Sequence, residues 1–212
     1  MEDLAGARRA MIDSQLRPEG VVDSAVVEAI AALPRENFVP AAARAFAYGD
    51  RPVPLGNGRA LAPPAVTGRL LSELEPRRGE RALVVGAGSG YTAAILASLG
   101  LKVIALESDA DLASLAKAAS PEIEVIEGKL AAGHPGGAPY DIILIDGAVE
   151  QIPEAIFAQL GEVGRVGAVI SDRGVTRLAV GRNIDGRVGL RTIADADVAP
   201  LPGFERPRAF TF

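Results

Sequence analysis

The chain has no cysteine, no tryptophan and a single histidine, His134. The absence of cysteine excludes disulfides, thiol nucleophiles and cysteine-ligated zinc. His134 lies in the loop sequence Gly-His-Pro-Gly-Gly, so we expect neither a metal ligand nor a catalytic base there. No metal site is predicted, and the sequence offers no thiol and no clear histidine for catalysis.

Blocks of like charge and long apolar runs are also missing. The net charge is −5, and basic residues occur only as scattered pairs such as Arg8-Arg9 and Arg77-Arg78. This pattern argues against a nucleic-acid groove. No apolar run reaches the length of a membrane span, and no signal-peptide pattern opens the chain. We therefore expect a cytoplasmic protein that binds neither nucleic acid nor a membrane.

The most informative stretch joins a short apolar strand to a glycine turn and a helix. Gly86, Gly88 and Gly90 have the spacing G-x-G-x-G. At such a turn a ligand can lie against bare backbone, with N–H groups directed at it. Glu107 ends the next apolar strand, seventeen residues after Gly90, where a carboxylate can accept from both hydroxyls of a ribose. The sequence therefore predicts an adenosine-type pocket.

The glycine spacing separates two kinds of adenosine cofactor. A dinucleotide site has G-x-G-x-x-G, but here the third glycine position holds Tyr91, and Gly90 comes one residue early. The observed spacing, followed by an acid at the next strand end, is typical of S-adenosylmethionine-dependent methyltransferases. A tight turn without a ligand is the alternative, and a nicotinamide dehydrogenase is not expected. The residues expected to contact S-adenosylmethionine in this motif are Gly86, Ala87, Gly88, Ser89, Gly90 and Glu107.

The order of the elements predicts an α/β fold with a doubly wound, mostly parallel sheet. Strands are expected at 81–85, 102–106, 123–127, 141–145 and 165–171, and helices at 90–99, 110–119 and 153–160. A hairpin with its turn at Asn183–Gly186 is expected to close one edge of the sheet. This arrangement corresponds to the seven-stranded, Rossmann-like sheet of class I methyltransferases. A final short strand is expected at 209–212.

The first eighty residues lack this alternation. Helices are expected from Asp3 to Leu16, from Asp23 or Ser24 to about residue 33, and from Pro64 to about Glu75. Residues 34–40 are expected to be an extended or turn segment, and the Gly- and Pro-rich residues 49–63 to form a long loop. We therefore divide one compact unit into an N-terminal helical extension with a substrate loop (1–76) and a cofactor-binding domain (77–212).

Four segments together resemble the protein-L-isoaspartate O-methyltransferase family. They are the opening helix Met11–Arg17, the proline-arginine segment Leu33–Pro40, the landmark Ala47–Asp50 and the cofactor loop Gly86–Tyr91. The resemblance implies methyl transfer from S-adenosylmethionine to the free carboxylate of an isoaspartyl residue in a damaged peptide or protein. A carboxylate with a pKa near 4 is already ionised at pH 7, so this reaction needs no general base.

The departures from the family pattern all fall at the site. The family's isoleucine-serine-glutamine-proline reads Leu61–Pro64 here, so Ala62 takes the position of the serine whose hydroxyl contacts the substrate carboxylate. Val84 replaces an acid before the glycine loop, and Lys129 replaces the aspartate that faces adenine. Only Glu107 remains among the expected acids. We therefore expect weak cofactor binding and a substrate loop that orients the substrate carboxylate poorly.

Three functions stay open at this stage. The first is isoaspartyl methyl transfer, with Arg59 expected either to bind a carboxylate in place of the lost hydroxyl or to lie solvated in its loop. The second is a non-catalytic binding module, which Ala62, Val84 and Lys129 favour. The third is methyl transfer to another acceptor, an amine or hydroxyl oriented by Asp146 at a strand end. The alternative for Asp146 is a structural acid that caps the following turn. The expected partner is a peptide or protein with isoaspartate, and the expected assembly is a monomer or homodimer.

Overall fold

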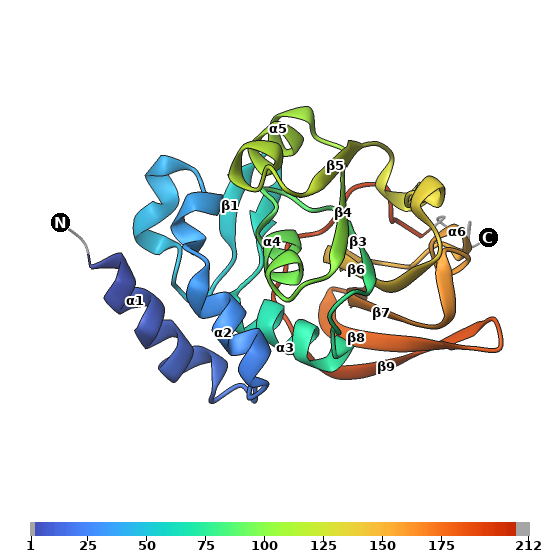
Figure 1. Cartoon of the computed structure of the whole chain (residues 1–212), viewed down its shortest axis with the longest axis horizontal. Coiled ribbons are helices and arrows are strands. Elements are labelled where there is room, and N and C mark those ends of the chain that lie inside the picture. Colours follow the sequence, from blue (N-terminus) through green and yellow to red (C-terminus); the bar gives the residue numbers. More distant parts are fainter. Residues whose placement is uncertain (1–2, 207–212) are drawn as a thin grey trace.

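A seven-stranded sheet forms the centre of the molecule, in the order β5-β4-β3-β6-β7-β8-β9 (Figure 1). The structure is a computed structural model that describes residues 3–206. The strands are β3 (Arg81–Val85), β4 (Lys102–Glu107), β5 (Glu124–Glu127), β6 (Tyr140–Val149), β7 (Leu160–Asp172), β8 (Val175–Ile184) and β9 (Arg187–Asp195). The first five are parallel, and β8 and β9 extend the sheet with antiparallel pairing. This is the class I methyltransferase sheet that the sequence predicts.

Alternating residues of β3 supply both faces of the sheet. Ala82 and Val84 pack into one apolar core with α2, α3 and α4, whereas Leu83 and Val85 pack into a second core with α6. All four are fully buried, as expected for a parallel strand covered on both faces. The helices that connect the parallel strands are α4 (Tyr91–Ser98), α5 (Ala110–Ala119) and α6 (Glu154–Phe157).

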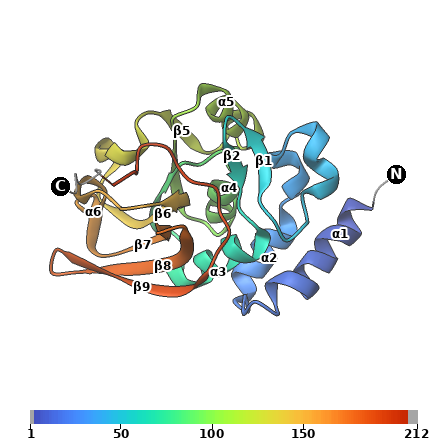
Figure 2. The same ribbon diagram turned by 180° about the vertical axis from the view of Figure 1, so that it is seen from behind.

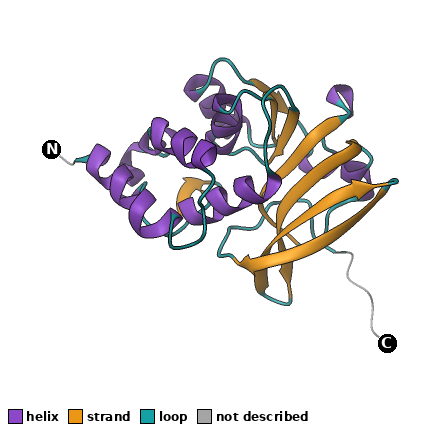
Figure 3. Ribbon diagram, turned by 60° about the horizontal axis from the view of Figure 1, so that its bottom comes forward, coloured by secondary structure: helices purple, strands orange, loops and turns teal. Residues whose placement is uncertain are grey.

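The N-terminal extension shares one apolar core with α4. Figure 3 shows most of the helices gathered on one side of the strands. It contains α1 (Leu4–Met11), which continues as a π-helical segment (Ile12–Leu16), then α2 (Ser24–Ala32) and α3 (Pro64–Leu74). The Asp23 carboxylate caps α2 by accepting from the Ala25 and Val26 amides. The extension thus shares a core with the sheet, and a domain division at residues 76 and 77 stays a prediction.

Two segments differ from the sequence-based prediction. Residues 34–40, expected to be an extended or turn segment, contain a 3₁₀ helix (Arg35–Phe38). The expected loop 49–63 contains an antiparallel hairpin of β1 (Val53–Gly56) and β2 (Arg59–Leu61). Its tip, Asn57-Gly58, has positive φ at both residues, which is the typical geometry of a tight hairpin turn. The Gly and Pro content of this stretch therefore marks a turn rather than an irregular loop.

Smaller differences concern the ends of elements. The helix expected at 153–160 is only four residues long, because β7 already begins at Leu160. The longest helix, α3, has 11 residues. Nowhere in residues 3–206 does a helix reach the length and apolarity that crossing a membrane requires. The strand expected at 209–212 lies outside the described residues.

Candidate functional site at the carboxyl edge of the sheet

The glycine turn joins β3 to α4 at the carboxyl edge of the parallel strands. The amides of Gly86 and Ala87 donate to the Leu106 carbonyl, at 2.9 and 3.1 Å. Gly86, Gly88 and Gly90 have φ values of 74°, 56° and 89°, which only glycine adopts without strain. The predicted strand-to-helix turn is confirmed, and the adjoining strand β4 ends at Glu107 as expected.

Glu107 is fully buried and surrounded by donors. Its Oε2 accepts from the Gly88 amide at 2.7 Å, and its Oε1 accepts from the amides of Ser108 at 2.7 Å and Asp109 at 3.1 Å. Arg59 Nη1 also donates to Oε1, at 2.7 Å. These donors hold the carboxylate directly beside the glycine turn.

Arg59 lies buried beside the glycine turn, although the sequence suggests a solvated residue or a ligand for a substrate carboxylate. The side chain comes from β2 and is only 7% exposed. Besides its ion pair with Glu107, Arg59 Nη2 donates to the Gly86 carbonyl at 2.9 Å. In this structure its carboxylate partner is therefore Glu107, and the guanidinium bridges the acid and the glycine turn.

Two leucines from distant segments lie close to the glycines. A Cβ placed on Gly88 would lie 3.1 Å from Leu55 Cδ1, and one placed on Gly86 would lie 2.8 Å from Leu201. Leu55 belongs to the β1–β2 hairpin, which lies beside α4 (Figure 2). The Leu201 amide donates to the Ala148 carbonyl on β6 at 2.8 Å. The space over the turn is thus filled by the chain's own side chains.

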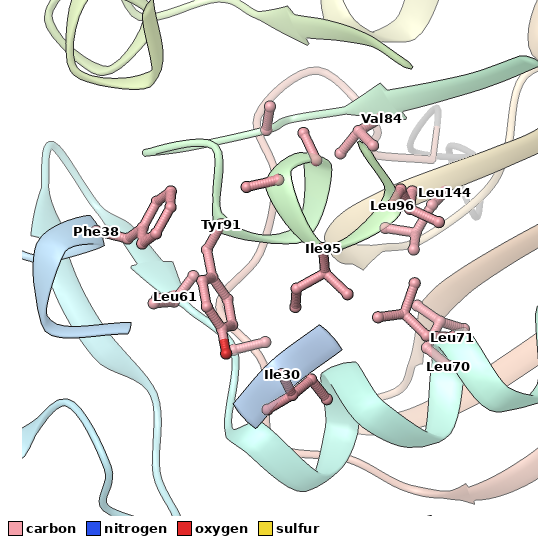
Figure 4. Packing of buried hydrophobic residues seen from close by; sticks show 14 of the residues in the cluster. Ile30, Phe38, Leu61, Leu70, Leu71, Val84, Tyr91, Ile95, Leu96 and Leu144 are labelled. Carbon is pink, nitrogen blue, oxygen red and sulfur yellow. The ribbon is translucent and has the colours of Figure 1, made fainter. Parts of the chain in front are cut away.

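The position of the family's serine lies at the far end of the same hairpin. Ala62 is buried, and its carbonyl accepts from Arg35 Nη2 at 2.6 Å. Arg35 also donates to the Ala47 carbonyl at 2.7 Å, and its guanidinium lies 4.9 Å from the centre of the Tyr91 ring. Phe38 packs edge-on against that ring (Figure 4). Burial lowers the pKa of Arg35.

Arg35 was not among the predicted site residues. The signal was nevertheless present, because an arginine between Pro34 and Glu36 belongs to a segment that resembles the family. Its full burial and its two carbonyl partners fix the course of the chain into and out of the hairpin. Arg35 therefore positions the segment that carries Ala62.

A small cavity adjoins Ala62, with a volume of about 10 Å³. Thr67, Thr92 and Asp146 contribute the polar groups of its lining. Among residues 3–206, the buried hydroxyls of the two threonines have no hydrogen-bond partner. Burial raises the pKa of Asp146. The space suits about one water molecule or one added hydroxyl group.

The remaining predicted residues lie in several different places. Ala87 and Ser89 are buried, and the Ser89 hydroxyl has no partner among the described residues. Lys129 is exposed just after β5, and Val84 lies within the core. His134 lies in a loop. In the described part of the chain, no three acidic or histidine side chains gather in a way that would hold a metal ion.

Comparison with known proteins agrees with this architecture. Residues 7–201 match the family model of protein-L-isoaspartate(D-aspartate) O-methyltransferase. A protein-L-isoaspartate O-methyltransferase of Methanoculleus marisnigri is 36% identical over 201 residues, covering 92% of this chain and 91% of that protein. One from Methylorubrum extorquens is 42% identical over 168 residues, covering 77% and 74% of the two chains.

Solved structures share the fold. A protein-L-isoaspartate O-methyltransferase superposes with a TM-score of 0.81 at 22% identity, covering 92% of this chain and 66% of that one. A putative member from Plasmodium falciparum, solved with S-adenosyl-L-homocysteine, has a TM-score of 0.79 at 21% identity, with coverage of 92% and 97%. At these identities the likeness concerns the fold.

Proposed function

The chain belongs to the protein-L-isoaspartate(D-aspartate) O-methyltransferase family, and we propose that it methylates the free carboxylate of isoaspartyl residues in peptides or proteins. The observation that carries this function is the family match over residues 7–201, which spans both the glycine turn and the hairpin opposite it. The methyl donor is S-adenosylmethionine. The expectation of a cytoplasmic monomer or homodimer stays a prediction.

The residues of the turn fit this donor. The glycines provide bare backbone at a helix N-terminus, and the unpartnered Ser89 hydroxyl is a spare polar group there. Glu107 is placed to accept from ribose hydroxyls once Arg59 withdraws from it. When bound, S-adenosylmethionine supplies an electrophilic methyl group on a sulfonium.

The substrate carboxylate needs positioning rather than deprotonation. It is ionised at neutral pH, so no residue of the chain has to act as a base toward it. The chain's contribution is to hold that carboxylate in line with the methyl group and to exclude water. We propose that the hairpin does this through the segment at Ala62, and that Arg59, after leaving Glu107, supplies a cation for the substrate carboxylate.

A non-catalytic binding module is the second candidate. Two observations favour it, because Ala62 has no hydroxyl to offer a substrate and Glu107 is already bound by Arg59. Such a protein would keep the fold and a peptide cleft without transferring a methyl group.

A pair of peptides of one sequence, with isoaspartate or with aspartate at one position, distinguishes these functions. The protein is incubated with each peptide and S-adenosylmethionine labelled in its methyl group, and base-labile methyl ester is counted. We expect label in the isoaspartyl peptide and none in the aspartyl peptide. Label in neither peptide, while the protein still binds the isoaspartyl one, would support the binding module instead.

A further inference from the structure

Glu107, the carboxylate expected to bind the ribose of the cofactor, is already paired with Arg59 from its own chain. We propose that Arg59 determines the affinity for the cofactor by competing with the ribose for Glu107. The proposal rests on the proposed function, since it concerns the same cleft. It assigns to Arg59 a role that the glycine motif and the family match do not.

The ion pair is built as an interior contact rather than a surface one. Arg59 Nη1 lies 2.7 Å from Glu107 Oε1, and the two side chains are 7% and 0% exposed. Buried pairs are screened little by salt. The contact of Arg59 with the Gly86 carbonyl gives the guanidinium a second partner, on the turn itself. The pair therefore opposes any group that approaches Glu107 from the hairpin side.

Arg59 is held there by one face of the hairpin. Every second residue of the hairpin from Leu55 to Arg59 contacts the carboxyl edge of the sheet. These residues are Leu55 on β1, Asn57 at the tip and Arg59 on β2. Leu55 lies over Gly88, and Asn57 Nδ2 donates to an Asp109 carboxylate oxygen at 2.7 Å. The three contacts act together, so releasing Arg59 requires the hairpin to shift or its side chain to swing away.

The exchange on Glu107 explains how Arg59 would weaken binding. Three backbone amides already donate to the carboxylate, from Ser108 and Asp109 after β4 and from Gly88 in the turn. With Arg59 in place, Glu107 has no exposed surface, so a ribose hydroxyl that binds this carboxylate has to take the place of the guanidinium. The exchange replaces a charge-assisted hydrogen bond from a cation with one from a neutral donor. The apparent affinity is reduced by the fraction of molecules in which Arg59 is withdrawn.

Titration calorimetry with S-adenosylhomocysteine tests this competition without any turnover. Arg59→Gln keeps a polar side chain but removes the cation that holds Glu107. Arg165→Gln is the matched control, because Arg165 is also buried and pairs with Glu80 at 2.5 Å, at the amino end of the strands. We expect Arg59→Gln to bind about tenfold or more tightly than the native chain, and Arg165→Gln to bind like it.

A second variant guards against a folding defect in Arg59→Gln. Leu55→Ala loosens the hairpin over Gly88 while leaving Arg59 and Glu107 in place, and it too should tighten binding, by less. Measurable binding to the native chain that neither variant improves would overturn the competition and leave the proposed function standing. No binding to the native chain or to either folded variant would overturn both. A gain in Arg165→Gln as large as in Arg59→Gln would also contradict the proposal.

Discussion

Two pieces of chain meet at the carboxyl edge of the sheet, and they are built in different ways. The β3–α4 turn is held by backbone groups, since its amides donate to Leu106 and Glu107 and its glycines adopt positive φ. The β1–β2 hairpin reaches the same edge through side chains, of which Arg59 makes the strongest contact. The turn has the form of a cofactor site, whereas the hairpin places a competing group in it.

The difference shows that a cofactor motif can be present in the sequence while its carboxylate is already bound by another residue of the chain. A glycine turn depends on local backbone geometry and forms wherever strand and helix require it. The state of its carboxylate depends on a residue 48 positions away in the sequence, which only the packing of the hairpin brings there. Substitutions on the two sides of this contact should therefore have different consequences.

The largest effect is expected at the shared acid. Glu107→Ala leaves Arg59 buried without its carboxylate and removes the acceptor of three backbone amides. Removing one partner of a buried pair costs about 3–5 kcal/mol of unfolding free energy. The surface pair of Lys117 and Glu127, about half exposed, provides the control, and Glu127→Ala should cost about 1 kcal/mol or less. If urea unfolding shows that both variants lose a similar free energy of unfolding, Glu107 does not stabilise this edge of the sheet more than a surface acid does.

The next effect concerns catalysis at the hairpin. The double change Ala62→Ser with Pro63→Gln restores the hydroxyl and amide that the resemblance leads us to expect, beside a cavity with room for about one such group. One oriented donor affects rates by on the order of 10²- to 10³-fold. Methylation of an isoaspartyl peptide should rise toward that range, measured as labelled ester per minute. If the native chain turns over as fast as the double variant, Ala62 is no handicap.

A smaller effect concerns Asp146 and pH. Burial raises the pKa of this carboxyl above its ordinary 3.8. Between 3.8 and the folded pKa, the folded protein therefore binds a proton that the unfolded chain has released. The stability contributed by Asp146 is therefore present below about 3.8 and is lost as pH rises through the folded pKa. Asp146→Asn should be more stable than the native chain at pH 7, because the amide carries no charge for burial to disfavour. The difference should shrink toward pH 4. Thermal melting at the two pH values checks this, and an equal gain at both would contradict it.

The smallest effect is expected at the hairpin tip. The hydrogen bond from Asn57 is the main reason that the pKa of Asp109 lies below its ordinary value. Asn57→Gly removes that donor and keeps a residue that accepts the positive φ of the turn. The pKa of Asp109 should rise, as followed by an NMR titration of its carboxyl carbon, with little change in melting temperature. An unchanged pKa would show that the tip does not bind the acid in solution.

Local signals in the sequence predicted most of the scaffold. The bounds of β3, the turn, α4 and α5 follow from apolar runs and glycines, which act within a few residues. The hairpin was missed, although Asn57-Gly58 is a hairpin signal, because the surrounding Gly and Pro residues suggested an irregular loop. The positions of Arg59 and Leu201 over the turn depend on distant packing, which no local pattern encodes.

The most direct measurement of the central claim is a crystal structure of the native protein with S-adenosylhomocysteine bound. The account predicts that the Arg59 guanidinium has left Glu107 and that the ribose hydroxyls donate to this carboxylate, with Leu55 shifted from Gly88. A complex in which the ligand lies on the glycine turn while the 2.7 Å contact between Arg59 and Glu107 persists would contradict it.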